Sequence, residues 1–268
     1  MLNKNFKQRV EQYLKPRESD DIYEIEKHGA LINGNYLIID TDLPITRESC
    51  EKYKDQIEVI ILTGKVKEIG KGAFEGYPNL NPVIYGPNLE KIGSFAFSGC
   101  KNLTQFMPMT SDKVQCSITS YYIEDPNYQN CMEINDKLKF IGQESFSDTA
   151  VQKVLIKNNN VKVRSGAFEG CSQLKKLVIK DVNNINLGVS CFAGCPELMV
   201  NCDTKAFKRI AKYVFADTKY GQLVSSNQKP ISQQNGEINI TKTKISNLEK
   251  VLKKPGDSHL SFQDTPVK

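Results

Sequence analysis

The sequence has few of the residues and segments that catalysis, membrane insertion or export require. Only two histidines are present, His28 and His259, and neither has a plausible catalytic or metal-binding partner. The motifs HExxH and G-x-S-x-G are both missing. No stretch approaches the roughly 18 apolar residues that cross a bilayer, and residues 1–16 lack the apolar segment of a signal peptide. We therefore expect a non-enzymatic protein of the cytoplasm, the alternative being the cell surface or secretion by a non-classical route.

Charge, glycine spacing and cysteine spacing exclude further classes of ligand. A net charge of +5 over 268 residues is too small for a dedicated nucleic-acid binder. The segment GKVKEIGKG at residues 64–72 fails as a phosphate-binding loop, because its glycine spacing is one residue too long and its last lysine precedes glycine. Cys191, Cys195 and Cys202 supply only three of the four ligands of a structural zinc site. We expect no cofactor, metal, small-molecule substrate or specific nucleic acid.

The sequence repeats itself with a period of about 23 residues. Each unit combines I-G-x-x-x-F, a small-residue turn and L-x-x-V-x-I, as in KEIGKGAFEGYPNLNPVIY from Lys67. The central phenylalanines are Phe74, Phe97, Phe146, Phe168 and Phe192, separated by 23, 49, 22 and 24 residues. A unit this short cannot bury its own apolar side, so it is stable only when neighbours stack into one long core. The spacing of 49 is about two periods, so residues 107–136 hold either a degenerate unit or an inserted loop.

These residues resemble the BspA-type leucine-rich repeat, whose usual pattern is I-x-x-I-G-x-x-A-F-x-G-C-x-x-L-x-x-I-x-I-P. The resemblance covers residues 57–202, although the third unit lacks the G-C turn and the fourth has Arg164 where glycine is usual. It implies a leucine-rich-repeat solenoid, a β-rich α/β fold with parallel strands stacked at a period of about 23 residues. We expect the phenylalanines to form one ladder in the core. The expected strands lie at residues 80–85, 103–108, 151–156 and 174–179.

Both ends of the repeat array are expected to be covered. Residues 1–56 form a mixed N-terminal cap with a helix, a hairpin at 30–39 centred on Asn33-Gly34 and a short helix from Thr46. The segment IEVIIL at 57–62 reads as a capping coil. Residues 203–226 form a helical C-terminal cap that begins at Asp203 or Thr204. Its apolar face consists of Ala206, Phe207, Ile210, Ala211 and Val214. Residues 227–268 are a polar tail that we expect to be disordered.

Three cysteines, Cys100, Cys171 and Cys195, follow a glycine at the same repeat position. A small apolar thiol that packs in the turn explains this placement. On adjacent coils Cys171 and Cys195 would stack about 5 Å apart, so a disulfide is the alternative.

The strands themselves predict a binding surface. Alternate strand side chains face opposite ways, so residues between core positions lie on the outer side of the sheet, here called the strand face. An apolar stripe is predicted there from Ile61, Ile84, Met107, Leu155 and Val178, flanked at its C-terminal end by Lys153, Lys157, Lys176 and Lys180. Such a surface suits a protein with an apolar ridge and an acidic end. Alternatively, parallel strands simply favour aliphatic residues, or the 107–136 insertion or the tail covers the stripe.

The sequence thus predicts a non-catalytic scaffold for protein–protein interaction that binds a macromolecular partner on the strand face. The family resemblance implies a second possibility, a cell-surface or secreted adhesin that binds a host or matrix component. A third, an enzyme that uses the 107–136 insertion, would need clustered catalytic groups. The insertion offers only Glu124, Asp125, Glu133 and Asp136, without a histidine.

Overall fold

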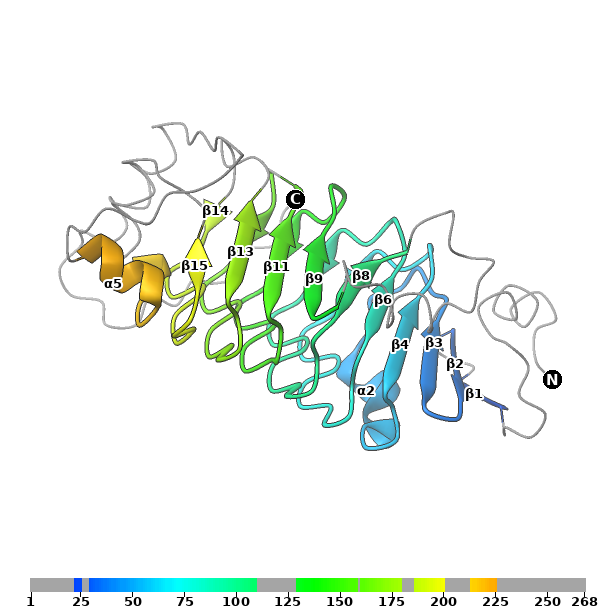
Figure 1. Cartoon of the computed structure of the whole chain (residues 1–268). Coiled ribbons are helices and arrows are strands. Elements are labelled where there is room, and N and C mark those ends of the chain that lie inside the picture. Colours follow the sequence, from blue (N-terminus) through cyan, green and yellow to red (C-terminus); the bar gives the residue numbers. More distant parts are fainter. Residues whose placement is uncertain are drawn as a thin grey trace, which may run out of the picture.

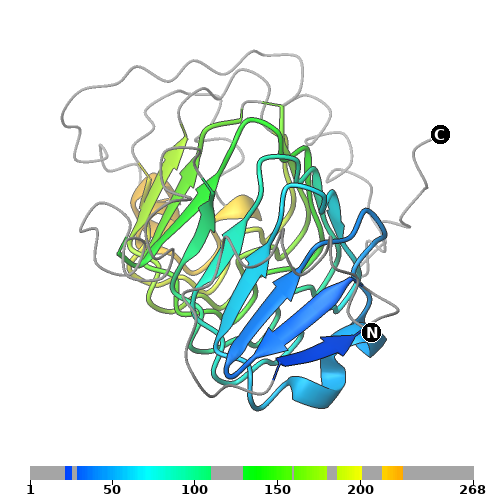
Figure 2. The ribbon, with the colours of Figure 1, turned by 90° about the vertical axis from the view of Figure 1, so that its right-hand side faces the viewer.

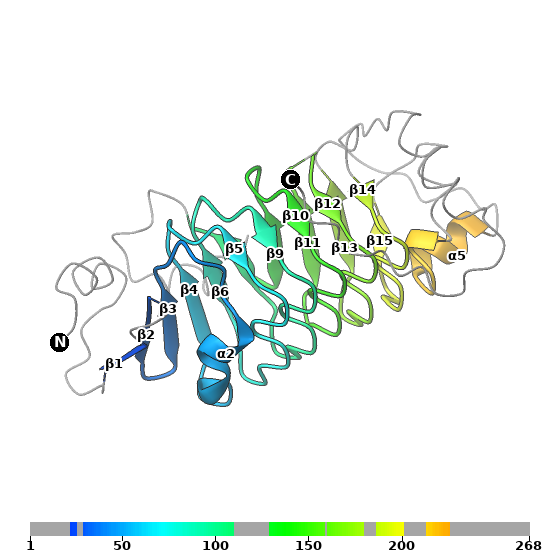
Figure 3. The same cartoon turned by 180° about the vertical axis from the view of Figure 1, so that it is seen from behind.

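The chain winds into a stack of coils that builds two sheets. The computed structural model describes residues 22–25, 29–109, 129–158, 160–179, 186–200 and 213–225. One sheet has ten strands and the other has five short ones. Figure 1 shows the strands of the ten-stranded sheet side by side, and the view from behind in Figure 3 shows the short strands on the opposite side of the coils. The predicted solenoid is confirmed.

The ten-stranded sheet contains, in spatial order, β1 (Ile22–Ile25), β2 (Ala30–Asn33), β3 (Tyr36–Ile39), β4 (Val59–Leu62), β6 (Val83–Tyr85), β8 (Phe106–Pro108), β9 (Cys131–Ile134), β11 (Lys153–Ile156), β13 (Lys176–Ile179) and β15 (Met199–Val200). The second sheet contains β14 (Asn186–Leu187), β12 (Lys162–Val163), β10 (Phe140–Ile141), β7 (Lys91–Ile92) and β5 (Glu68–Ile69). Within the described ranges the helices are α2 (Arg47–Cys50), the 3-10 turn η1 (Glu51–Tyr53) and α5 (Lys219–Ser225). Strands β6, β8, β11 and β13 end at the residues where the repeat pattern placed the strand ends.

A ladder of phenylalanine rings runs through the core between the sheets. Neighbouring rings lie 5.2 to 5.5 Å apart between centroids and are nearly parallel, with interplanar angles of 2° to 23°. Phe97 stacks directly on Phe146 although 49 residues separate them. Beyond the predicted rungs the ladder gains Phe215, which stacks on Phe192 at 5.5 Å. All six rings are fully buried, so the ladder supplies much of the apolar burial that stabilises the stack.

Residues 107–136 add a strand to the ten-stranded sheet only. Strand β9 pairs with β8 on one side and β11 on the other, whereas β7 pairs directly with β10 in the second sheet. The β8–β9 pairing is limited to one register pair, Phe106 with Met132. The hydroxyl of Tyr85, from β6, donates a hydrogen bond to the Glu133 carbonyl at 2.8 Å and accepts one from the Asn135 amide at 3.2 Å. This tyrosine therefore satisfies backbone groups at the end of β9 that β8 leaves unpaired.

The N-terminal end extends the ten-stranded sheet instead of closing it at residues 57–62. Figure 2 looks at this end of the stack and shows β1, β2 and β3 lying outside β4. The predicted capping coil is therefore an interior strand, because β3 pairs in parallel with β4. The hairpin of β2 and β3 turns at Gly34-Asn35, one residue later than predicted, since Asn33 pairs with Tyr36. Gly34 adopts the positive φ of 57° that such a tight turn requires.

The C-terminal end combines a last rung with a short helix. Phe215 belongs to the phenylalanine ladder, and Tyr220 of α5 packs edge-on against it at 5.3 Å. Val214, expected on the apolar face of a cap helix, is buried. The start of that predicted helix, at 203–212, lies outside the described residues, as do the expected first helix at 1–16 and the tail at 227–268.

Candidate partner-binding face

The predicted stripe occupies one register row of the ten-stranded sheet. Ile61 lies beside Ile84, and Ile84 beside Met107. Leu155 lies beside Val178 on the last pair of long strands. All five residues lie on the strand face, because the residue before each one packs in the core instead. The structure thus brings Ile61, Ile84 and Met107 together, and Leu155 and Val178 together, in the predicted order.

The N-terminal half of the stripe is buried. Ile61, Ile84 and Met107 have no exposed surface and belong to a second apolar cluster that is separate from the core. The other members of this cluster are Leu31, Ile38, Val59 and Cys131, with Tyr36, Met109 and Leu155 at its margin. The prediction that the stripe is accessible to a partner is therefore wrong for this half. This burial favours the alternative that other residues of the same chain cover the stripe. Residues 110–128 and 226–268, which include most of the insertion and the tail, lie outside the described residues.

A carboxylate interrupts the stripe at its middle. Glu133, on the inserted strand β9, occupies the stripe position beside Leu155. Its side chain is only 6% exposed and forms an ion pair with the Lys157 ammonium at 2.6 Å. A buried carboxylate requires such a partner. Lys157, predicted to contact a partner, is therefore committed to an internal ion pair. The predicted stripe omitted this position because β9 carries none of the phenylalanine and glycine landmarks of the other units.

The C-terminal half of the stripe is accessible. Leu155 and Val178 are half-buried, Lys153 is half-buried and Lys176 is exposed. Lys153 lies directly beside Lys176 in the register of β11 and β13. Like charges at neighbouring strand positions repel each other when no partner is bound. Lys180, the last predicted site residue, lies outside the described residues. The accessible surface thus combines two aliphatic side chains with two adjacent ammonium groups.

The comparison with protein families decides the classification of the fold. The model described as "BspA type Leucine rich repeat region" matches residues 44–113 and 105–222 with six copies, which is more than half of the chain.

The chain belongs to this family.

Two solved structures are similar to this BspA-type protein. A leucine-rich repeat protein of T. pallidum has 19% identity and a TM-score of 0.33, and the match covers 76% of this chain and 98% of the other. A leucine-rich repeat protein from Bacteroides ovatus has 19% identity and a TM-score of 0.34, covering 69% of this chain and 46% of the other. No curated protein matches the chain.

The BspA-type turns hold the three predicted cysteines as packed thiols. Each Sγ donates to the carbonyl of the phenylalanine on the preceding coil, at 3.1 Å for Cys100, 3.1 Å for Cys171 and 3.2 Å for Cys195. All three are free and buried, so the structure contains no disulfide between Cys171 and Cys195. Burial raises the pKa of Cys100 to about 12, which makes its thiol a packing group and a poor nucleophile.

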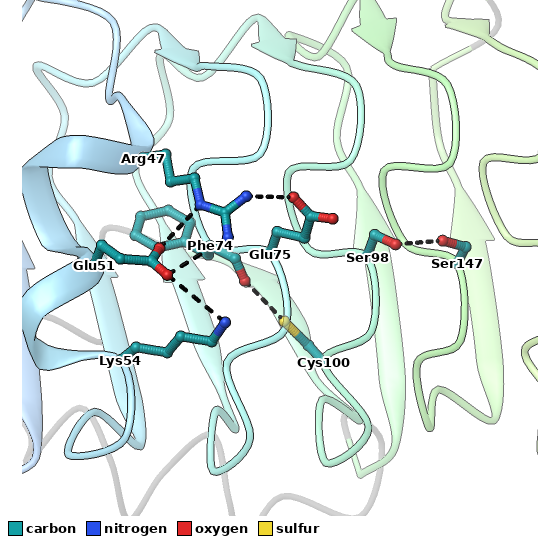
Figure 4. Close-up of polar contacts among 8 residues, drawn as sticks. All are labelled: Arg47, Glu51, Lys54, Phe74, Glu75, Ser98, Cys100 and Ser147. Carbon is teal, nitrogen blue, oxygen red and sulfur yellow. Dashed lines mark hydrogen bonds and ion pairs between the residues drawn. The ribbon is translucent and has the colours of Figure 1, made fainter.

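Polar contacts also join α2, at the N-terminal end, to the first turn of the repeats (Figure 4). The Arg47 guanidinium forms ion pairs with Glu51 at 3.1 Å and with Glu75 at 2.9 Å. On the next coils the Ser98 and Ser147 hydroxyls lie 2.8 Å apart. The Arg47 ion pairs are exposed to solvent, where such pairs add little stability.

The described part of the chain gathers no catalytic constellation. It contains no cluster of three or more potential metal ligands, and neither histidine falls within it. Of the insertion's four acids, Glu133 is committed to Lys157, Asp136 is exposed, and Glu124 and Asp125 lie outside the described residues. No helix in the described ranges is long and apolar enough to cross a membrane.

Proposed function

We propose that this BspA-type protein is a non-catalytic scaffold that binds a protein partner on the accessible half of the strand face. The observation that supports the proposal is the pairing of Lys153 with Lys176 beside the half-buried Leu155 and Val178. Two adjacent ammonium groups repel each other across neighbouring strands, and a partner carboxylate placed between them removes that repulsion. Aliphatic groups next to the charges add apolar contact area. The partner is therefore a protein surface with an apolar ridge that ends in acidic residues.

The family and the stacked architecture support the same reading. Leucine-rich-repeat proteins are commonly scaffolds for protein interaction, and solenoids present extended surfaces whose variable residues determine binding. Strands β11 and β13 hold the four side chains on a rigid sheet, because each strand is paired on both sides. A rigid site limits the entropy lost on binding.

Affinity capture with single-site variants tests the proposal. Lys176→Glu reverses a charge in the site, and Lys101→Glu makes the same change at an exposed turn residue away from the sheet. Val178→Asp places a carboxylate within the aliphatic part. We expect a partner captured by the wild type and by Lys101→Glu to be lost with Lys176→Glu and Val178→Asp, all three variants showing the wild-type circular dichroism spectrum. Capture of the same proteins by every folded variant would refute the assignment to this face.

A further inference from the structure

The apolar cluster on the N-terminal half of the strand face points away from the core, yet it is buried. Its stripe members Ile61, Ile84 and Met107 have no exposed surface. Leu155 and Val178, in the same row on β11 and β13, are only half-buried. Every described member of the cluster, including those at its margin, belongs to a strand of this sheet or directly follows one. The sheet alone therefore does not bury the cluster, and a further part of the chain is needed over β4, β6 and β8.

The connection between β8 and β9 takes a different route from the other connections of the repeats. The chain normally passes from one strand of the large sheet to the next through the second sheet, as from β6 to β8 through β7. Between β8 and β9 this route is blocked, because β7 pairs directly with β10 and Phe97 stacks on Phe146 at 5.2 Å. Since β8 and β9 are parallel, residues 110–128 must return along the outside of one of the two sheets.

The exposure of the two outer faces distinguishes these routes. On the second sheet the outward residues Lys91, Lys162 and Asn186 are exposed. On the ten-stranded sheet, Met107 of β8 and Cys131 of β9 are buried. Crossing on the strand face gives the connection the hand opposite to that of the other coils, which parallel strands rarely adopt. Burial on this side and exposure on the other nevertheless favour the strand face.

The sequence of residues 110–128 suits an apolar surface of this size. Val114, Cys116 and Ile118 alternate with polar residues, the pattern of an extended segment with one apolar side. Residues 121–123, Y-Y-I, add larger apolar groups. Fully extended, the segment spans up to about 63 Å, whereas the cluster extends over about 24 Å, five strand spacings from β2 to β9. The segment is therefore long enough to cross the cluster and return.

Both ends of this segment adjoin the cluster. Met109 lies at the margin of the cluster, and Cys131 is a member of it. A segment tethered at both ends loses less entropy on docking than one held at a single end. Residues 1–21 join the described chain only at β1, and residues 226–268 only after α5, which Figure 1 shows at the opposite end of the stack from β1. Residues 110–128 are therefore favoured over both.

We propose that residues 110–128 of this chain dock on the N-terminal half of the strand face, with the apolar side formed by Val114, Cys116 and Ile118 against the buried stripe. Without this cover, apolar side chains of six neighbouring strands would form an exposed patch of the kind that promotes association. The docked segment leaves Leu155 and Val178 accessible, so it also sets the boundary of the strand-face site proposed above.

Methionine oxidation by hydrogen peroxide tests this cover in the full chain. Met107 lies in the cluster and Met132 lies in the core, and both are fully buried, so both are expected to resist oxidation in the wild type. Ile118→Asp places a carboxylate on the apolar side of the segment. We expect Met107 to be oxidised about tenfold faster in this variant while Met132 stays protected, as measured by peptide mass spectrometry. Thr119→Asp, with the same carboxylate on the opposite side, is expected to behave as the wild type.

Replacement of whole segments identifies the cover independently of one substitution. A glycine–serine linker of equal length in place of residues 112–126 is expected to expose Met107 at least as much as Ile118→Asp does. If this linker variant also oxidises Met132, its coils have opened, and the comparison of Ile118→Asp with Thr119→Asp decides. Slow oxidation of Met107 in Ile118→Asp would overturn the proposal. So would rapid oxidation of Met107 when residues 1–20 or 228–268 are replaced instead, which would assign the cover to another segment. None of these measurements requires a bound partner, so they are independent of the proposed function.

Discussion

Removing the hydroxyl of Tyr85 tests how the inserted strand β9 is held. In Tyr85→Phe the ring keeps its stacking on Phe106, whose centroid is 4.6 Å away, because the change removes only one oxygen. The Glu133 carbonyl loses its donor and the Asn135 amide loses its acceptor. A buried polar group left without a partner costs about 1 to 3 kcal/mol. Since the Asn135 amide is only partly buried, we expect a loss of about 2 kcal/mol of unfolding free energy.

Urea unfolding followed by circular dichroism measures this loss as a lower midpoint. Hydrogen exchange supplies a local readout, because the Asn135 amide is expected to exchange faster in Tyr85→Phe. Tyr36→Phe is the matched control: within the described ranges the Tyr36 hydroxyl has no hydrogen bond, so we expect a change within about 0.5 kcal/mol. If both variants unfold at the same urea concentration and the Asn135 amide stays protected, Tyr85 does not anchor β9 and the reasoning fails.

Three further predictions concern single coils. Ser145→Ala removes a buried hydroxyl without a partner in the described structure and is expected to stabilise the fold by about 1 kcal/mol; a lower urea midpoint would contradict this. Gly142→Ala places a Cβ 2.4 Å from Gly93, so thermal unfolding is expected to show a loss of about 2 kcal/mol, and an unchanged melting temperature would argue against it. With its pKa at about 12, the Cys100 thiol is expected to resist iodoacetamide at about pH 8 until urea unfolds the chain; mass spectrometry that finds rapid alkylation of the folded protein would disprove this.

Periodic features of the fold could be predicted from the sequence, because stacking requires the same residue types at the same places in every coil. The phenylalanine ladder and the strand ends follow from that requirement. The predicted helical cap at 203–226 includes Phe215, although F-A-D-T at 215–218 repeats F-S-D-T at 146–149. Asp148 and Asp217 share the same positive φ of 56°, so the two segments also fold alike. The unit was missed because aspartate replaces the glycine of the other turns.

The candidate site could be predicted only in part. Alternation along a strand fixes which side chains leave the core, and it placed Leu155 and Val178 correctly on the strand face. It does not fix which strands are neighbours where the period breaks. The insertion of β9 therefore placed Glu133 unexpectedly beside Leu155. Alternation also cannot show what covers an outward side chain, so the burial of Ile84 was not foreseen.

The direct stacking of Phe97 on Phe146 has a consequence for how the chain could be divided. The coils before residue 109 and those after residue 129 are joined by this ring contact, by the pairing of β7 with β10 and by the pairing of β8 with β9. None of these contacts needs the peptide chain that connects the two blocks. Two separately produced fragments, divided between residues 109 and 129, would therefore present complementary apolar ends to each other. We expect such fragments of this BspA-type protein to reassemble when they are mixed.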